Sequence, residues 1–295
     1  MDQEADAMLG ELLSRPFTIA RPERQSAPFV FASPHSGRLY PPSFLALSAL
    51  APKMLRRAED AFVEELFAGA VALGAPLIAA RFPRVFVDVN RAPGELDPAM
   101  FGAPLPQAIE AHSPRVAAGL GVIPRLVREG APIYRAKLAP GEAQLRLMRL
   151  HRPYHAALAG LVEETRARFG VATVVDCHSM PSGGPVADIV LGDRYGASAP
   201  AELMRHAELS FQSAGFSTAR NTPYAGGYTT HLYARHQDGI CALQIEVNRA
   251  LYLDEDRIER GAGFEQTRAR LARALCLLIG VDVAILRQRP PLAAE

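Results

Sequence analysis

Two histidines follow short apolar runs, which is the position of a residue at the end of a buried β-strand. His35 lies in Ser-Pro-His-Ser-Gly (33–37), and His178 lies in Asp-Cys-His-Ser-Met (176–180). Taken singly, each histidine is more readily explained as a turn residue that caps a backbone group. Two strand-end histidines with nearby carboxylates are, however, the ligands of a hydrolytic zinc site, which leaves a fourth position for water. The pair therefore indicates a metalloenzyme.

The third ligand of such a site has to be a carboxylate. The acidic pair Glu59-Asp60 lies near the start of a helix predicted over residues 55–73. Acidic residues at a helix start also interact favourably with the helix dipole, so the pattern alone leaves capping and coordination equally open. Beside His178, Asp176 and Ser179 are placed to orient the ring through hydrogen bonds.

Glu246 lies within the apolar run Ala-Leu-Gln-Ile-Glu-Val (242–247). Burying a carboxylate in an apolar strand costs free energy, so such a residue is expected to have an ionic partner or a catalytic role. Burial would raise its pKa, which suits a general base that removes a proton from a metal-bound water. Two structural explanations remain: a salt bridge to an arginine, or a solvated strand face that Glu246 shares with Gln244 and Asn248.

Four arginines lie near predicted strand ends: Arg84, Arg91, Arg194 and Arg249. A planar guanidinium binds a carboxylate through two parallel hydrogen bonds, so this grouping favours a small anionic substrate. The alternative is ion pairing with neighbouring aspartates.

A glycine-rich loop covers residues 221–231, and it is either an active-site flap with glycine hinges or an ordinary turn. No phosphate-binding loop, dinucleotide fingerprint or Gly-X-Ser-X-Gly motif is present. Cys177 is no candidate nucleophile, because adjacent strand residues point to opposite faces and it cannot meet His178. His151 and His155 share a helix face, but Pro153 between them disturbs the helix, so we expect a structural role.

Strands alternate with helices along the chain, which predicts an α/β fold with a mostly parallel sheet and helices on both faces. In such folds, sites gather at the carboxyl ends of the strands. We expect one domain over residues 26–286, a peripheral segment over 1–25 and a tail over 287–295. Predicted strands cover 28–32, 76–80, 85–89, 171–175, 188–192 and 240–247. Further predicted helices cover 201–215, 261–279 and 145–169, the last kinked or split in two at Pro153.

Composition excludes several classes of protein. The 295 residues carry a net charge of +1 without charged blocks, so we expect no nucleic-acid partner. The longest apolar runs are too short to span a bilayer, so we expect no membrane partner either. Three cysteines without repeated spacing, and a first segment without signal-peptide features, favour a cytoplasmic location. The oligomeric state stays open.

Seven motifs, in order along residues 28–255, resemble those of the N-formylglutamate amidohydrolase family. They are Ser-Pro-His-Ser-Gly (33–37), Phe-Pro-Arg-Val-Phe-Val-Asp-Val-Asn-Arg (82–91), Glu-Leu-Asp-Pro (95–98), His-Arg-Pro-Tyr-His (151–155), Asp-Cys-His-Ser-Met (176–180), Asn-Thr-Pro-Tyr-Ala-Gly-Gly-Tyr (221–228) and Leu-Gln-Ile-Glu-Val-Asn-Arg (243–249). The resemblance implies a phosphorylase/hydrolase-like sandwich, similar to zinc carboxypeptidases and zinc-dependent amidases. It also implies hydrolysis of N-formyl-L-glutamate to formate and L-glutamate in histidine degradation.

The resemblance also implies roles for individual residues. His35, His178 and an acidic residue near position 60 would hold Zn²⁺ or another divalent metal. Asp60 is preferred to Glu59, because in the family pattern an Asp leads into the Leu-Phe stretch (66–67). Glu246 falls where related amidases place the catalytic base. Beyond the resemblance, we assign Arg84 or another arginine to the oxyanion. We assign one or two of Arg91, Arg194 and Arg249 to the substrate carboxylates, and Asn221 and Tyr224 to substrate binding.

Two alternatives stay open. The first is an amidase for another N-acyl amino acid or small peptide, with the same metal chemistry and a different pocket. The second is a non-catalytic relative that binds a dicarboxylate.

Overall fold

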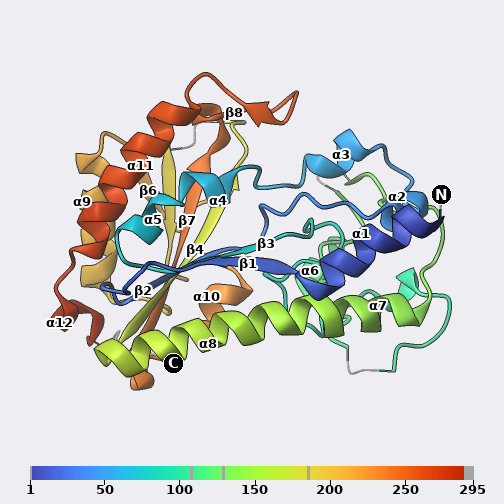
Figure 1. The fold of residues 1–295 in the computed structure, drawn as a ribbon, viewed down its shortest axis with the longest axis horizontal. Coiled ribbons are helices and arrows are strands. Elements are labelled where there is room, and N and C mark those ends of the chain that lie inside the picture. The colour runs from blue at the N-terminus through green and yellow to red at the C-terminus, as the bar shows by residue number, and fades with distance from the viewer. Residues whose placement is uncertain (1, 107–108, 128–129, 185–186, 289–295) are drawn as a thin grey trace. The chain divides into compact units, whose positions relative to one another are not determined.

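The fold is built on one seven-stranded sheet (Figure 1). The computed structural model describes residues 2–106, 109–127, 130–184 and 187–288. The strands lie in the order β1 (Phe17–Ala20), β3 (Leu77–Ala80), β2 (Phe29–Ser33), β4 (Ala172–Met180), β7 (Ile240–Asn248), β5 (Ile189–Gly192) and β6 (Thr218–Arg220). The pairs β2–β4, β4–β7 and β5–β6 are parallel, and β5–β7 is antiparallel. The prediction of an α/β fold with a mostly parallel sheet is confirmed.

The chain forms two compact units that alternate along the sequence. The first holds the described parts of residues 1–18, 34–59 and 79–157, and the second those of 19–33, 60–78 and 158–295. Helices of the first unit are α1 (Asp2–Ser14), α2 (Pro42–Leu47), α3 (Pro52–Arg56), α6 (Pro114–Ala117) and α7 (Pro140–Arg146). Those of the second are α4 (Val63–Leu66), α5 (Gly69–Ala72), α9 (Ala201–Ser213), α10 (Tyr228–Tyr233), α11 (Phe264–Ile279) and α12 (Val283–Leu286). The helix α8 (Arg152–Phe169) has residues in both units, and a short hairpin, β8 (Leu253–Asp254) and β9 (Glu259–Arg260), follows β7 in the second.

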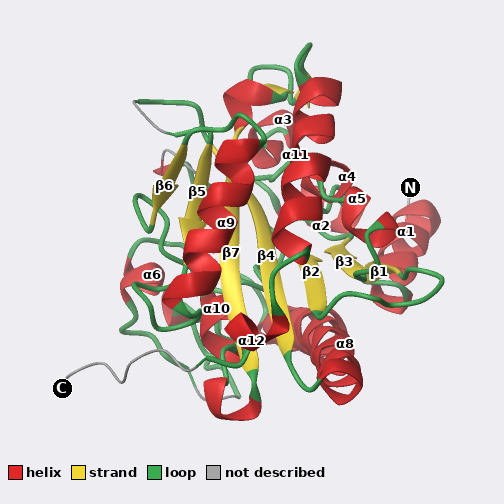
Figure 2. Ribbon diagram, turned by 90° about the vertical axis from the view of Figure 1, so that its left-hand side faces the viewer, coloured by secondary structure: helices red, strands yellow, loops and turns green. Residues whose placement is uncertain are grey.

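In the second unit, the two faces of the sheet differ in chemistry. Apolar side chains such as Val175, Cys177 and Ile245 belong to a core that also includes residues of α9 and α11, which lie in front of the sheet in Figure 2. Because side chains alternate along a strand, the residues between them point to the other face. That face carries Asp176 and His178 of β4 and Gln244, Glu246 and Asn248 of β7, all buried. We call these five residues the polar face.

The helix predicted over residues 55–73 is broken in the structure. Only α3, α4 and α5 form, and Phe62 just before α4 has a left-handed backbone with φ of 63°. An aromatic residue adopts this conformation only where the surrounding structure holds it. The break places Asp60 on a turn rather than on a helix surface.

The strand predicted over residues 85–89 is also wrong. Backbone N–H groups of Phe86 and Val87 bond to the carbonyl oxygen of Pro83, which makes this segment a turn. The apolar side chains are buried nevertheless, and burial without sheet pairing is a context that a run of apolar residues cannot reveal.

The interruption predicted at Pro153 is confirmed. A π-helical segment, Leu147–His151, separates α7 from α8, and Pro153 is the second residue of α8. Proline removes one intrahelical hydrogen bond and clashes with the preceding turn, so a local widening of the helix accommodates it. Sequence patterns missed α1, β1 and β6, and the tail expected over 287–295 lies outside the described residues after position 288. The other domain limits stay predictions.

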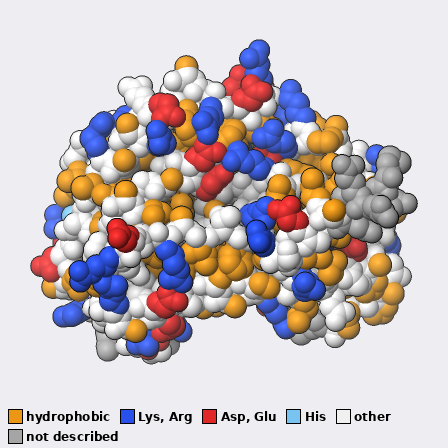
Figure 3. Space-filling model, viewed as in Figure 1, with side chains coloured by type: hydrophobic (Ala, Val, Ile, Leu, Met, Phe, Trp, Pro, Cys, Tyr) orange, Lys and Arg blue, Asp and Glu red, His pale blue; other side chains and the backbone are white. Residues whose placement is uncertain are grey.

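The surface carries mixed charges. On the face of the molecule in Figure 3, basic and acidic side chains are interspersed, in keeping with the net charge of +1. None of the helices in the described ranges is both long and apolar enough to cross a bilayer.

Candidate metal and catalytic site

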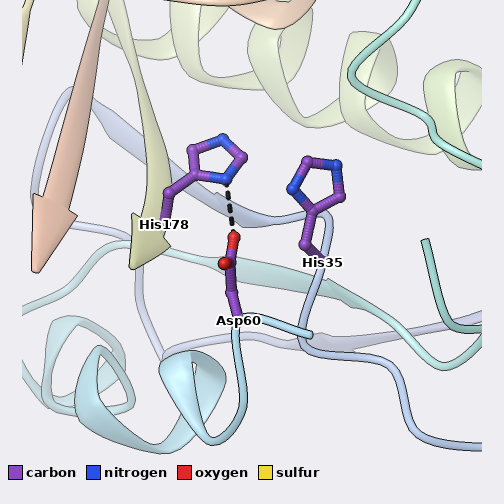
Figure 4. Close-up of side chains that lie close together, drawn as sticks. All are labelled: His35, Asp60 and His178. Carbon is purple, nitrogen blue, oxygen red and sulfur yellow. Dashed lines mark hydrogen bonds and ion pairs between the residues drawn. The ribbon is translucent and has the colours of Figure 1, made fainter. Parts of the chain in front are cut away.

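Three buried side chains have the composition of a metal site. One potential ligand atom from each of His35, Asp60 and His178 lies within 4.8 Å of the others (Figure 4). Two imidazole nitrogens and one carboxylate oxygen are the protein ligands of many catalytic zinc sites, in which the fourth position takes water or substrate. The donor set therefore fits a divalent metal.

His178 is held from both sides by carboxylates of its own unit. Its Nε2 lies 3.0 Å from Oδ2 of Asp176, two residues earlier on the same face of β4, and its Nδ1 lies 2.9 Å from Oδ2 of Asp60. Burial acts to lower the pKa of His178, but Asp176 and Asp60 outweigh it and raise this pKa well above its usual value. A metal that binds Nδ1 of His178 has to displace the proton that this nitrogen shares with Asp60, while Asp176 keeps the ring oriented.

Asp60 is held by three groups of the second unit. Besides His178, the hydroxyl of Ser179 and Nη2 of Arg249 donate to its Oδ1, at 3.1 and 3.0 Å. Nε of Arg249 also donates to the Ser179 hydroxyl at 3.0 Å. This network leaves the Asp60 carboxylate with one defined orientation. Ser179 therefore positions Asp60 rather than the His178 ring.

Glu59 is used differently. In the first unit, it accepts hydrogen bonds from the Tyr40 hydroxyl at 2.7 Å and from Nε of Arg56 at 3.1 Å. Burial raises the pKa of Glu59 above its usual value, although Arg56 and Tyr40 oppose this. Of the acidic pair, the structure brings only Asp60 into the cluster with the two histidines.

His35 has a matching support within the first unit. Its Nε2 lies 2.7 Å from Oδ1 of Asp88, so Nδ1 is the nitrogen that can serve as a ligand. Burial alone would raise the pKa of Asp88, but Arg84, His35 and Arg91 hold it well below its usual range. Asp88 therefore stays ionised and orients the His35 ring, as carboxylates behind metal-bound histidines do. Asp88 lies within the segment predicted as a strand over residues 85–89, and the sequence signal for its role is Arg84 four residues before it.

His151 and His155 secure the segment that contains Asp88. Their Nε2 atoms donate to the backbone carbonyl oxygens of Arg91 and Val89, at 2.9 and 2.8 Å, and all four residues belong to the first unit. This geometry agrees with the expected structural role of the two histidines.

These histidines should make the protein sensitive to mild acid. Burial, reinforced by His151, lowers the pKa of His155 to about 3, whereas an unfolded histidine titrates near 6.5. Between these pH values the unfolded chain binds more protons than the folded one. The free energy of unfolding therefore has its full value above about pH 6.5 and falls as the pH drops below it. In His155→Gln, which keeps a donor for Val89, the loss of unfolding free energy from pH 7 to pH 5 should be smaller by about 1–2 kcal/mol.

Urea unfolding at the two pH values measures this difference. The control is His206→Gln, because the His206 ring also bonds a backbone carbonyl, that of Leu277. Equal losses in the wild type and in His155→Gln would contradict the prediction.

Glu246 lies beside His178 on the polar face. The two residues are register partners in the parallel pair β4–β7, and the charge of Glu246 adds to the raised pKa of His178. Nε2 of Gln244 donates to Oε1 of Glu246 at 2.8 Å, and both side chains are buried. Gln244 therefore fixes one oxygen of Glu246, a role that its position in the sequence, which suggested only a solvated face, did not indicate.

The four arginines have different surroundings. Arg249 is bound to Asp60 and Ser179, and Arg84 donates to Oδ2 of Asp88 at 2.8 Å. Arg91 donates to the backbone carbonyls of Leu120 and Asn90. Arg194 follows β5, which runs antiparallel to β7, so it does not lie at the strand edge that carries Glu246. Their roles toward a substrate stay predictions.

The two predicted substrate-binding residues of the loop also differ. The Asn221 side chain donates to Asp193 at 2.7 Å and accepts from the Asp193 backbone N–H at 3.0 Å, so its amide serves the loop itself. Tyr224 is 38% exposed and is the more accessible of the two.

Comparisons with known proteins show which family the chain resembles. The sequence matches the N-formylglutamate amidohydrolase family over residues 27–253. It is 29% identical over 242 residues to an N-formylglutamate deformylase of Pseudomonas aeruginosa, covering 79% of this chain and 85% of that protein. An N-formylglutamate deformylase of Pseudomonas putida is 30% identical over 205 residues, which cover 66% of this chain and 71% of that protein.

A solved structure agrees with the sequence matches. The N-formylglutamate amidohydrolase from Ralstonia eutropha JMP134 is 37% identical, with a TM-score of 0.84, and the match covers 90% of this chain and 97% of that one. The family match spans more than half of the 295 residues. The chain therefore belongs to the N-formylglutamate amidohydrolase family.

Proposed function

We propose that this protein hydrolyses N-formyl-L-glutamate to formate and L-glutamate. The observation that carries the proposal is the buried cluster of His35, Asp60 and His178, with Glu246 as the register partner of His178. Family membership and the names of the relatives support an amide-bond hydrolase and this substrate. The same reaction is compatible with the expected place in histidine degradation and with a cytoplasmic location, which both stay predictions.

We propose Zn²⁺ as the metal, held by Nδ1 of His35, Nδ1 of His178 and a carboxylate oxygen of Asp60. Nitrogen and carboxylate ligands also accept Mn, Fe or Co, so the donor set supports zinc without excluding these metals. When bound, the metal would lower the pKa of a coordinated water and polarise the amide carbonyl. Asp88 and Asp176 keep the two imidazole rings in the orientation that binding requires.

Glu246 is the proposed general base. It accepts a proton from the attacking water as the new C–O bond forms at the formyl carbon, and it passes this proton to the nitrogen as the C–N bond breaks. The hydrogen bond from Gln244 to Oε1 holds the Glu246 carboxylate in place beside His178. Arg84 remains our candidate for stabilising the oxyanion, because its side chain is a quarter exposed while one nitrogen is anchored to Asp88.

The test is release of formate and glutamate by metal-stripped and zinc-reloaded protein, assayed side by side. We expect release only after reloading, and recovery in proportion to bound zinc. Release that is independent of metal would contradict the proposed site. A protein that binds zinc but does not release formate would direct the search to other N-acyl amino acids, or to the binding-protein alternative.

A further inference from the structure

The loop that follows β6 rests on the polar face of the sheet. Gly192 is the register partner of Gln244 in the antiparallel pair β5–β7, so a side chain at position 192 would point to the same face as Gln244. A Cβ there would lie 2.7 Å from the backbone carbonyl of Ala225. Only glycine therefore lets the loop pack against this face, next to Gln244.

Arg194 is tied to the same loop. Its backbone N–H donates to the carbonyl oxygen of Ala225 at 2.7 Å, and the Asp193–Asn221 pair locks the two segments together. A Cβ at Gly226 would lie 2.8 Å from Cγ of Arg194 and 2.6 Å from the hydroxyl of Thr230. The Arg194 side chain thus passes directly over Gly226, beside α10.

Charge distinguishes Arg194 from the other candidates. Arg84 and Arg249 form ion pairs with carboxylates that support the metal cluster. Arg91 donates hydrogen bonds to two backbone carbonyl groups. Within the part of the chain that the structure describes, no carboxylate forms an ion pair with Arg194, which is partly exposed. Its guanidinium is therefore available to an anionic ligand.

Distance along the sheet selects one end of the substrate. Gln244, opposite Gly192, is two residues or about 7 Å from Glu246 along β7. The side-chain carboxylate of an extended glutamate lies about 5 Å from its amide nitrogen, and a long arginine side chain spans the remaining gap. A substrate that extends from Glu246 toward Gln244 brings its side-chain carboxylate to the side of Arg194.

We propose that Arg194 is the specificity-determining residue that recognises the side-chain carboxylate of the N-acyl amino acid. This inference rests on the proposed function, because it names the substrate class of the same site. It predicts selection for an acyl amino acid with an acidic side chain over its neutral isostere.

The experiment compares N-formylglutamate with N-formylglutamine in the wild type and in Arg194→Met. In the variant, kcat/KM for N-formylglutamate should fall roughly 100-fold, mainly through KM, as expected for a lost charged hydrogen bond. The value for N-formylglutamine should change less than about threefold. Arg194→Lys should recover part of the loss. Equal losses for both substrates, or no loss for either, would overturn the proposal.

The matched control is Arg220→Met, because Arg220 ends the neighbouring strand β6 and is paired with Glu208. It should leave the preference for N-formylglutamate unchanged. Calorimetric titration with L-glutamate and L-glutamine separates this inference from the proposed reaction. If the wild type binds glutamate but hydrolyses neither substrate, the reaction fails, and loss of glutamate binding in Arg194→Met still supports the recognition role. A variant that binds glutamate as tightly as the wild type would refute it.

Discussion

Replacing Glu246 by Gln should lower kcat for formate release roughly 1,000-fold while the protein keeps its metal. General acid–base catalysis contributes about 10²–10⁴-fold, and a neutral amide can neither accept the water proton nor deliver it to the leaving nitrogen. The substitution preserves the shape of the side chain and an oxygen that can accept the hydrogen bond from Gln244. Steady-state kinetics and metal content of the same preparation test the two parts of the prediction.

A second carboxylate controls for the loss of charge itself. Glu208 forms an ion pair with Arg220 and has no part in the proposed chemistry, so Glu208→Gln should retain the wild-type rate. If Glu246→Gln turns over at nearly the wild-type rate, the base has been assigned to the wrong residue. If it loses its metal together with its activity, Glu246 supports the metal cluster instead.

Replacing Asp60 by Asn should weaken zinc binding by more than about 100-fold, which exceeds the usual effect of changing a residue behind the ligands. An amide oxygen is a poorer ligand than a carboxylate, but it can still accept hydrogen bonds from Ser179 and Arg249. The fold should therefore survive, as a thermal melt of the metal-free protein would show. Competition with a chelator measures the affinity, and activity should fall with zinc occupancy.

The neighbouring residue supplies the matched control. Glu59 is buried, and because this burial raises its pKa, a neutral side chain costs less desolvation there than the carboxylate. Glu59→Gln keeps an acceptor for Tyr40 and should keep wild-type zinc affinity. The reverse pattern, with zinc lost in Glu59→Gln and retained in Asp60→Asn, would transfer the ligand role to Glu59.

Local sequence patterns determined the strands that carry most of the candidate site. Buried apolar runs placed β2, β4, β5 and β7 nearly where they occur, because a strand buried on both faces requires a continuous apolar run. The period of two along a strand then put Gln244 and Glu246 on one face. His35 and His178 were identifiable for the same reason, since each follows or ends such a run.

Only the tertiary structure decided how the polar residues are used. Asp60 joins the cluster because the predicted helix is interrupted near Phe62, whose left-handed backbone is held by the surrounding packing against the helical pattern. Asp88 became the partner of His35 because its segment folds as a turn instead of the predicted strand. The antiparallel direction of β5 separated Arg194 from Arg249, which pairs with Asp60. Strand direction and ion pairing depend on residues that are far apart in the sequence, so a local pattern of residue types cannot predict either of them.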